Sequence, residues 1–231
     1  MTNELRMDFG RMARVGITEA VLCAGKTAAQ IAVAMDQARA NGTPLLLTRL
    51  DSDALAGLDS EQRGAIDYDA PSATGIFGDW KAPGGSPRVA IVTAGSSDLG
   101  VAHEAARTLS FHGHASHLIG DIGVAGLWRL LERQDELRDY PVIIAIAGMD
   151  GALFSVLGGL IGGLLIAVPT STGYGAARGG ETSLHSALAS CAPGVVAVNI
   201  DNGYGAACAA LRALNMYDTH SLTTPTEGNT P

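Results

Sequence analysis

The sequence is poor in positive charge. Its lysines are Lys26 and Lys81, and the formal net charge is −8 at pH 7. Binding to nucleic acid or to an anionic membrane needs a broad basic face, so we expect neither as a partner. Any phosphate group must therefore be bound locally. Aromatic residues are also scarce, at 5%, whereas 30 glycines and 47% apolar residues suit an α/β domain packed by alanine, valine and leucine.

Cysteine is scarce as well, and its pattern suggests no disulfide framework. The cysteines are Cys23, Cys191 and Cys208, an odd number, which favours a reducing cytoplasm. The N-terminal residues are charged where a signal peptide needs an apolar core, so we do not expect export. Residues 152–168 approach the length of a membrane span but contain four glycines. We predict a buried helix, a turn and a buried strand there.

Proline and glycine gather at residues 81–87, which predicts a linker between two domains. We expect a small N-terminal α/β domain at residues 1–80 and a catalytic domain at residues 88–217. Residues 218–231 have the composition of a disordered tail.

Strands and helices alternate after the linker with few interruptions. Short apolar strands joined by helical crossovers indicate a parallel sheet covered on both faces, a doubly wound three-layer α/β/α fold. The expected strands are residues 88–94, 115–119, 141–147, 164–168 and 195–200, and the expected helices are residues 99–112, 124–137, 151–160, 181–190 and 205–214. In the first domain we expect a helix at residues 27–42, capped by Thr27, and a strand at residues 44–50, whereas residues 51–80 are too irregular to assign.

Segments of similar composition follow several of these strands: AGSSD, AGMDGAL, PTSTGYGAARGG and NIDNGYGAA. Ligands of an open parallel sheet bind beyond the carboxyl ends of its strands. Small residues with hydroxyls, amides and carboxylates are expected where backbone amides approach a phosphate or ribose. Glycine-rich turns also serve tight packing, but we favour ligand binding. The candidate contacts are Ser96, Ser97, Thr170, Ser171, Gly173, Tyr174, Gly175, Asn199 and Asn202.

Standard phosphate motifs are absent from the sequence. It contains no GxxxxGK[ST], and no GxGxxG follows the first strand of the catalytic domain. That domain has no lysine and seven arginines, of which Arg178 lies within a candidate segment and is the natural phosphate contact. Arg14, Lys26 and Arg49 can be simple surface charge. Because the catalytic domain lacks lysine, we keep them as phosphate or adenylate contacts, within one subunit or across subunits.

Three further residues have both a structural and a functional interpretation. Asp98 can cap the helix that follows it, but its place in GSSD favours substrate binding or proton transfer. Asp201 can belong to an ordinary turn, but its place after a strand end favours contact with ribose, phosphate or a metal ion. Cys191 alone would be a packing cysteine. Its SCAPG context favours a nucleophile, whereas Cys208 and Cys23 keep the packing interpretation.

The strings AGSSD, AGMDGAL, PTSTGYGAARGG, SCAPG and VNIDNGYGAA, with DFGRMARVG and EAVLCAGKT near the start, resemble the LarB family. LarB proteins are the carboxylase/hydrolase of nickel-pincer nucleotide cofactor biosynthesis, and the resemblance covers residues 8–214. The AGSSD string is also similar to the GSxSD motif of aminoimidazole ribonucleotide carboxylase. The resemblance implies a PurE-like C-terminal domain and a homo-oligomer, an octamer in the family.

The resemblance also implies a reaction. Nicotinic acid adenine dinucleotide, CO2 and water would give pyridinium-3,5-biscarboxylic acid mononucleotide and AMP, with Mg2+ assisting and no tightly bound organic cofactor. Cys191 would be the nucleophile that adds to the pyridinium ring. Asp150 stands where the family has glutamate, and we count it with Asp98 among the catalytic candidates. Metal ligands are not fixed by the sequence, although Asp201 is a candidate.

Two alternatives stay open. An aminoimidazole ribonucleotide carboxylase or mutase would share the fold and the GSSD segment but would not need Cys191. A non-enzymatic regulatory protein, similar to those labelled circadian phase modifiers, would turn over no dinucleotide.

Overall fold

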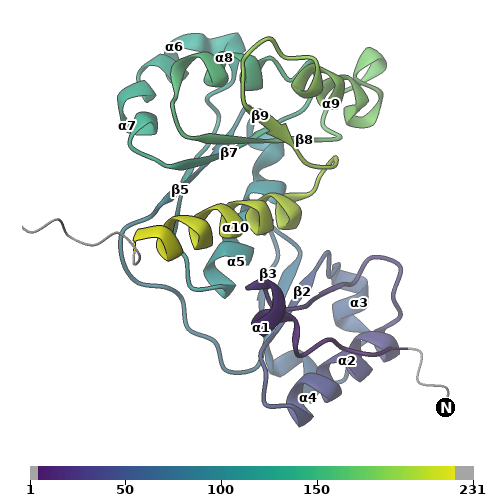
Figure 1. The fold of residues 1–231 in the computed structure, drawn as a ribbon. Coiled ribbons are helices and arrows are strands. Elements are labelled where there is room, and N and C mark those ends of the chain that lie inside the picture. The colour runs from purple at the N-terminus through teal and green to yellow at the C-terminus, as the bar shows by residue number, and fades with distance from the viewer. Residues whose placement is uncertain (1–4, 222–231) are drawn as a thin grey trace, which may run out of the picture.

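Two sheets organise the chain, as Figure 1 shows for a computed structural model that describes residues 5–221. The N-terminal sheet has the strand order β1-β2-β4-β3, with β1 parallel to β2 and the other pairs antiparallel. Its strands are β1 (Ala20–Leu22), β2 (Leu45–Thr48), β3 (Ile66–Asp69) and β4 (Thr74–Phe77).

The helices of this domain are α1 (Arg11–Val15), α2 (Ala28–Ala40), α3 (Ser52–Ala56) and α4 (Ser60–Gly64). The predicted helix and strand at residues 27–42 and 44–50 are confirmed as α2 and β2. Thr27 caps α2 by accepting a hydrogen bond from the backbone N–H of Gln30. Residues 51–80 showed no pattern because α3, α4, β3 and β4 are only four or five residues long, too short to show a period.

The second sheet is wholly parallel and has the order β6-β5-β7-β8-β9. Its strands are β5 (Val89–Thr93), β6 (Ser116–Ile119), β7 (Val142–Ala147), β8 (Leu164–Pro169) and β9 (Val195–Ala197). The central strands β5 and β7 are buried at every position, as their continuous apolar runs require when both faces of a sheet are covered.

Helices cover both faces of this sheet (Figure 1). One face packs against α5 (Leu99–Phe111) and α10 (Gly203–Ser221), and the other against α6 (Leu127–Leu131), α7 (Gln134–Arg138), α8 (Ala152–Leu160) and α9 (Glu181–Leu188). Short 3-10 segments are η1 (Ser96–Asp98), η2 (Val124–Gly126) and η3 (Gly175–Gly180). The predicted doubly wound α/β fold is confirmed.

Some element boundaries differ from the prediction. The single helix expected at residues 124–137 is divided into η2, α6 and α7, although Leu130 and Leu137 are both fully buried. The apolar spacing thus marked the buried positions but not the break between them. Strand β9 ends at Ala197 instead of residue 200, and α10 reaches Ser221, inside the expected tail. The rest of that tail lies outside the described residues.

Residues 152–168 form α8 and β8 with a turn between them, as predicted. Within the described part of the chain, no helix is long and apolar enough to cross a membrane.

The two domains meet along α5. Trp80 donates a hydrogen bond from Nε1 to the carbonyl oxygen of Ser110, at 3.4 Å. Arg107 on α5 donates to the Asp67 side chain at 3.1 Å and lies over the Trp80 ring. These contacts join the N-terminal domain to the outer surface of a catalytic-domain helix.

Candidate active site

The strand order creates a crevice at the carboxyl edge of the catalytic sheet. The chain leaves β5 for β6 on one side and returns to place β7 on the other, so the loops after β5 and β7 diverge. Ligands of doubly wound sheets bind at such a switch point. A cavity of about 230 Å³ lies there, lined by Ala94, Gly95, Ser97, Asp98, Gly123, Val124, Ala125, residues 147–153 and Thr172. The predicted location of the site is thus matched by a cavity.

Asp98 is buried at the base of this cavity. Its Oδ2 accepts a hydrogen bond from the backbone N–H of Gly95 at 3.1 Å, and its Oδ1 accepts one from the hydroxyl of Thr170 at 2.7 Å. It makes no side-chain cap to α5. The carboxylate therefore ties the loop after β5 to the loop after β8, which places Thr170, another predicted contact, beside it.

The loop after β7 brings Asp150 to the cavity mouth. Asp150 is exposed, and its Oδ1 accepts a hydrogen bond from the backbone N–H of Ala152 at 3.2 Å. Met149 donates its backbone N–H to the carbonyl oxygen of Thr172, at 2.9 Å. This approach requires glycine at position 148, because a Cβ there would lie 2.2 Å from the Thr172 carbonyl oxygen. The loops after β7 and β8 are consequently held together.

Asp201 links three segments at the same edge. Its Oδ1 accepts the backbone N–H of Ser171 at 2.8 Å, and its own N–H donates to the carbonyl oxygen of Pro169 at 2.8 Å. Its carbonyl oxygen accepts a hydrogen bond from Arg49 of the N-terminal domain at 2.7 Å. Asn202 is a cap, since its Oδ1 accepts the N–H of Gly205 in the first turn of α10.

The remaining predicted contacts lie in different places. Ser96, Asn199 and the segment with Gly173, Tyr174, Gly175 and Arg178 are exposed at the carboxyl edge but do not line the cavity. Tyr174 is 81% exposed, and Arg178 has a left-handed backbone, with φ 48°. Arg14, which lies on α1, pairs with Asp8. Within residues 5–221, neither Arg14 nor Lys26 forms a hydrogen bond or ion pair with the catalytic domain, whereas Arg49 does.

Cys191 lies apart from the cavity. It belongs to the loop between α9 and β9, and so to the amino end of a parallel strand rather than its carboxyl end. Its thiol is free and exposed. The loop is held against α8 by a hydrogen bond between the hydroxyls of Ser155 and Ser190, at 2.8 Å. Within one described chain, Cys191 does not line the cavity.

Glu104 is a buried acid that the sequence interpretation missed. It lies on α5, and its Oε2 accepts the backbone N–H of Tyr204 at 3.2 Å, at the start of α10. Burial raises the pKa of the Glu104 carboxyl, although hydrogen bonds from Tyr204 and Gly203 and the charge of Arg49 oppose the rise. No local pattern in the sequence marks it, because its hydrogen bond to Tyr204 joins residues 100 positions apart.

We expect Glu104→Gln to be as stable as the wild type or more stable near neutral pH. The raised pKa means that the folded chain binds the proton more tightly than the unfolded chain. Wild-type stability should therefore fall as pH rises from the ordinary carboxyl pKa, about 4.3, through the raised one. Glutamine has no such dependence and can still accept the N–H of Tyr204. Thermal unfolding of both proteins across this pH window measures the difference, and an advantage of the variant that does not grow with pH would contradict the argument.

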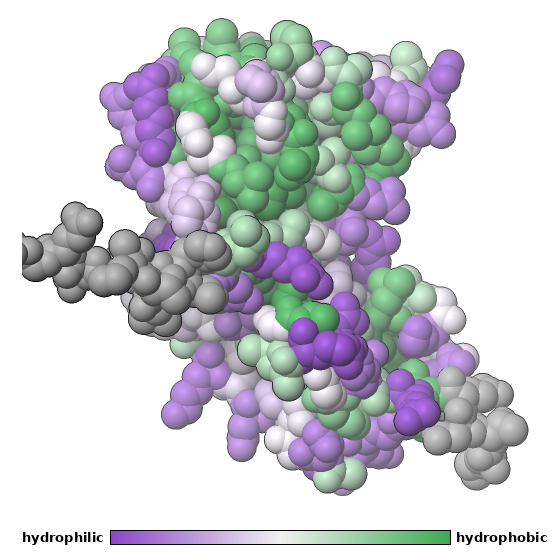
Figure 2. Space-filling model, in the orientation of Figure 1, coloured by the Kyte–Doolittle hydropathy of each residue, from purple (hydrophilic) through white to green (hydrophobic). Residues whose placement is uncertain are grey.

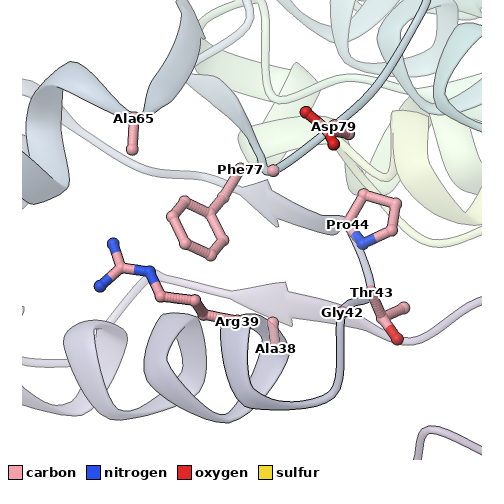
Figure 3. Close-up of a pocket in the computed structure, with 9 residues that line it drawn as sticks. Ala38, Arg39, Gly42, Thr43, Pro44, Ala65, Phe77 and Asp79 are labelled. Carbon is pink, nitrogen blue, oxygen red and sulfur yellow. The ribbon is translucent and has the colours of Figure 1, made fainter.

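A larger cavity, about 490 Å³, lies in the N-terminal domain (Figure 3). It is lined mostly by small or apolar residues: Ala38, Gly42, Thr43, Pro44, Ala65, Phe77 and Gly78, with Arg39 and Asp79. Arg39 lies over the Phe77 ring, 5.4 Å from its centroid. None of the predicted catalytic residues lines this cavity, so size alone does not locate the active site.

In the described residues, no group of three or more histidine, cysteine, aspartate or glutamate residues could hold a metal ion.

Comparison with known proteins agrees with the division into two sheets. Residues 2–78 match the family model of the LarB/PurE-like N-terminal domain, and residues 88–226 match that of AIR carboxylase. An uncharacterised protein of Methanocaldococcus jannaschii is 47% identical over 122 residues. The aligned part is 52% of this chain and 46% of that protein, so the alignment spans about half the length of the relative.

Two solved structures from Treponema denticola are also similar. They are PurE, with 19% identity, and a substituted variant of PurE2, with 22% identity. Each has a TM-score of 0.44 and is covered over 94% of its length, against 59% and 60% of this chain respectively.

Proposed function

The chain belongs to the LarB family, with a LarB/PurE-like N-terminal domain followed by an AIR carboxylase domain, and from this we propose its reaction. The family is that of a carboxylase-type enzyme. The chain would convert nicotinic acid adenine dinucleotide, CO2 and water into pyridinium-3,5-biscarboxylic acid mononucleotide and AMP, the first step of nickel-pincer nucleotide cofactor biosynthesis. The pairing of the two domains is the observation that supports this reaction over a purine carboxylase.

The chemistry needs a nucleophile because a pyridinium ring is electron-poor and its C5 cannot attack CO2. The Cys191 thiolate would add to the ring and form a C–S bond, giving a neutral dihydropyridine with an enamine-like carbon. That carbon would attack CO2. Loss of its proton would then expel the thiolate and restore aromaticity, so the net change is CO2 gained and a proton released. Cysteine suits both the addition step and the elimination step because a thiolate is a good nucleophile and a good leaving group.

The two carboxylates of the cavity would have different roles. Asp98 is buried, and its two oxygens accept hydrogen bonds from Gly95 and Thr170, so it would shape the cavity by holding the loops after β5 and β8 together. Asp150 is exposed at the mouth and would accept the ring proton. Ser97 and Thr172, which also line the cavity, would contact the ribose or phosphate of the mononucleotide half.

Hydrolysis of the pyrophosphate needs positive charge and a positioned water. Arg178 is the arginine that we assign to the phosphates at the carboxyl edge. Mg2+, when bound, would supply charge neutralisation there, and Asp201 would hold it with the oxygen that does not accept the Ser171 N–H. Magnesium is usually held by one or two carboxylates together with substrate phosphates. Asp201 as the one protein carboxylate on the ion would fit that pattern.

Cys191 has to reach the ring although it does not line the cavity of its own chain, and we propose that a second copy of the chain brings it there. Large apolar side chains are exposed on the catalytic domain, among them Trp128 (62%) and Leu188 (68%). Figure 2 shows hydrophobic residues gathered on this domain, which forms the upper part of the view. Such a surface is typical of an interface between subunits.

We expect a homo-oligomer in solution, and membership of the family predicts an octamer. Light scattering after size exclusion measures its mass against the 23.6 kDa of one chain. Leu188→Glu, close to Cys191 in sequence, should reduce the mass and the activity together because a charge cannot be buried unpaired. A fully active monomer would contradict the proposal.

The function is tested by incubating the purified protein with nicotinic acid adenine dinucleotide, bicarbonate and Mg2+ and following AMP and the biscarboxylated mononucleotide by mass spectrometry. Formation of both products supports the proposal. The AIR carboxylase match favours one alternative, carboxylation of aminoimidazole ribonucleotide. Turnover of that compound instead of the dinucleotide would select it.

A further inference from the structure

Arg49 joins the two domains at the carboxyl edge of the catalytic sheet. It follows β2 directly, and its Nη2 donates to the carbonyl oxygen of Asp201, at 2.7 Å. Both residues have left-handed backbone conformations, with φ 50° for Arg49 and φ 55° for Asp201. An arginine rarely adopts this conformation, because its Cβ crowds the following carbonyl group. The surrounding structure must therefore hold Arg49 in place.

The neighbours of Arg49 supply that restraint. Thr48 ends β2, and its carbonyl oxygen accepts the N–H of Cys23 at 2.8 Å. Leu50 is fully buried and donates its N–H to the carbonyl oxygen of Ala73 at 2.7 Å. The backbone thus turns at Arg49 between two residues that are held by hydrogen bonds, and the exposed Arg49 side chain extends to the other domain. Strained residues held in this way gather at functional sites.

Asp201 connects Arg49 to the loops of the candidate site. Its N–H and its carboxylate both bond to the segment after β8, through Pro169 and Ser171. The same segment contains Thr170, which bonds to Asp98 at the base of the cavity. A contact from Arg49 to Asp201 can therefore fix the loops after β8 and β9 relative to the cavity.

We propose that Arg49 is a positioning residue of the catalytic domain, acting from the N-terminal domain by holding Asp201 and the loops that Asp201 joins. This inference rests on the proposed function of that edge, and it revises the assignment of Arg49 as a direct phosphate contact. The N-terminal domain then contributes to catalysis through one guanidinium group at the domain contact.

Kinetics of Arg49→Ala separate positioning from direct binding. We expect kcat with nicotinic acid adenine dinucleotide to fall by roughly 10²-fold, as for a small displacement of catalytic groups, with KM changed much less. Arg49→Lys keeps a charged donor and should recover part of kcat. A rise in KM with unchanged kcat would overturn the inference in favour of a direct substrate contact.

Arg107→Ala is the matched control. Arg107 also joins the two domains, through Asp67 and the Trp80 ring, but away from the carboxyl edge. It should lower the thermal stability and leave kcat near that of the wild type. If Arg107→Ala loses as much kcat as Arg49→Ala, then Arg49 is only one of several domain tethers and the inference is wrong.

Hydrogen–deuterium exchange tests the same inference without any substrate. In Arg49→Ala, the backbone amides of residues 170–173 and 199–205 should exchange faster, whereas in Arg107→Ala they should match the wild type. This readout remains decisive if the wild type fails to turn over the dinucleotide, a result that would remove the proposed function alone. Unchanged exchange in Arg49→Ala would overturn the inference.

Discussion

Cys191→Ala is expected to abolish formation of the biscarboxylated mononucleotide while leaving the fold intact. The thiolate makes and breaks the bond that activates the ring, and nothing else in the proposed reaction can replace it, so the rate should fall by on the order of 10³-fold or more. Cys191 is exposed, and its loop is held by the Ser155–Ser190 contact rather than by the thiol. Its loss should therefore change stability by less than about 0.5 kcal/mol.

Mass spectrometry of the products measures this prediction, and Cys208→Ala is its control. Cys208 lies on α10 and is partly buried against the apolar core, so its loss should cost some stability but no activity. A second readout comes from the adduct itself. Wild-type protein trapped during turnover should carry the mass of the pyridine nucleotide on the peptide that contains residue 191. Full formation of the biscarboxylated mononucleotide by Cys191→Ala would exclude the cysteine mechanism. Full activity of the variant on aminoimidazole ribonucleotide would favour the purine carboxylase.

Continuous apolar runs made the catalytic sheet predictable from the sequence. Strands β5 and β7 are buried on both faces, so their positions are apolar except for Thr93 at the end of β5, and the apolar run itself marks the strand. The order of the strands in the sheet could not be predicted in the same way, because it depends on which strands pair after each helical crossover. The crevice between the loops after β5 and β7 could therefore be predicted only as a position somewhere at the carboxyl ends of the strands.

The candidate site was predictable as a set of loops but not as a set of contacts. The hydrogen bond from Thr170 to Asp98 joins residues 72 positions apart, and the one from Arg49 to Asp201 joins residues 152 apart. No local pattern encodes such pairs. The position of Cys191 was also not predictable. The SCAPG string indicated a nucleophile, but the topology of the strands determines at which end of the sheet the cysteine lies.

Asp98→Ala is expected to destabilise the fold and to disturb the site at once. The substitution leaves the Thr170 hydroxyl and the Gly95 N–H without their acceptor, and both face a carboxylate that is only 2% exposed. Losing hydrogen bonds to a charged group and stranding their buried partners should cost roughly 3 kcal/mol of the free energy of unfolding. Because the same bonds join the loops after β5 and β8, activity should fall as well.

Urea unfolding at one fixed protein concentration measures the loss, with two comparisons that separate its causes. Asp150→Ala removes an exposed carboxylate from the same cavity and should change stability by no more than about 0.5 kcal/mol. Thr170→Val removes only one of the two bonds to Asp98 and keeps the shape of the side chain, so its cost should lie between the other two. If Asp98→Ala were no less stable than Asp150→Ala, Asp98 would not be the residue that holds the cavity together. Its place in the GSSD segment would then favour a direct role in substrate binding or proton transfer.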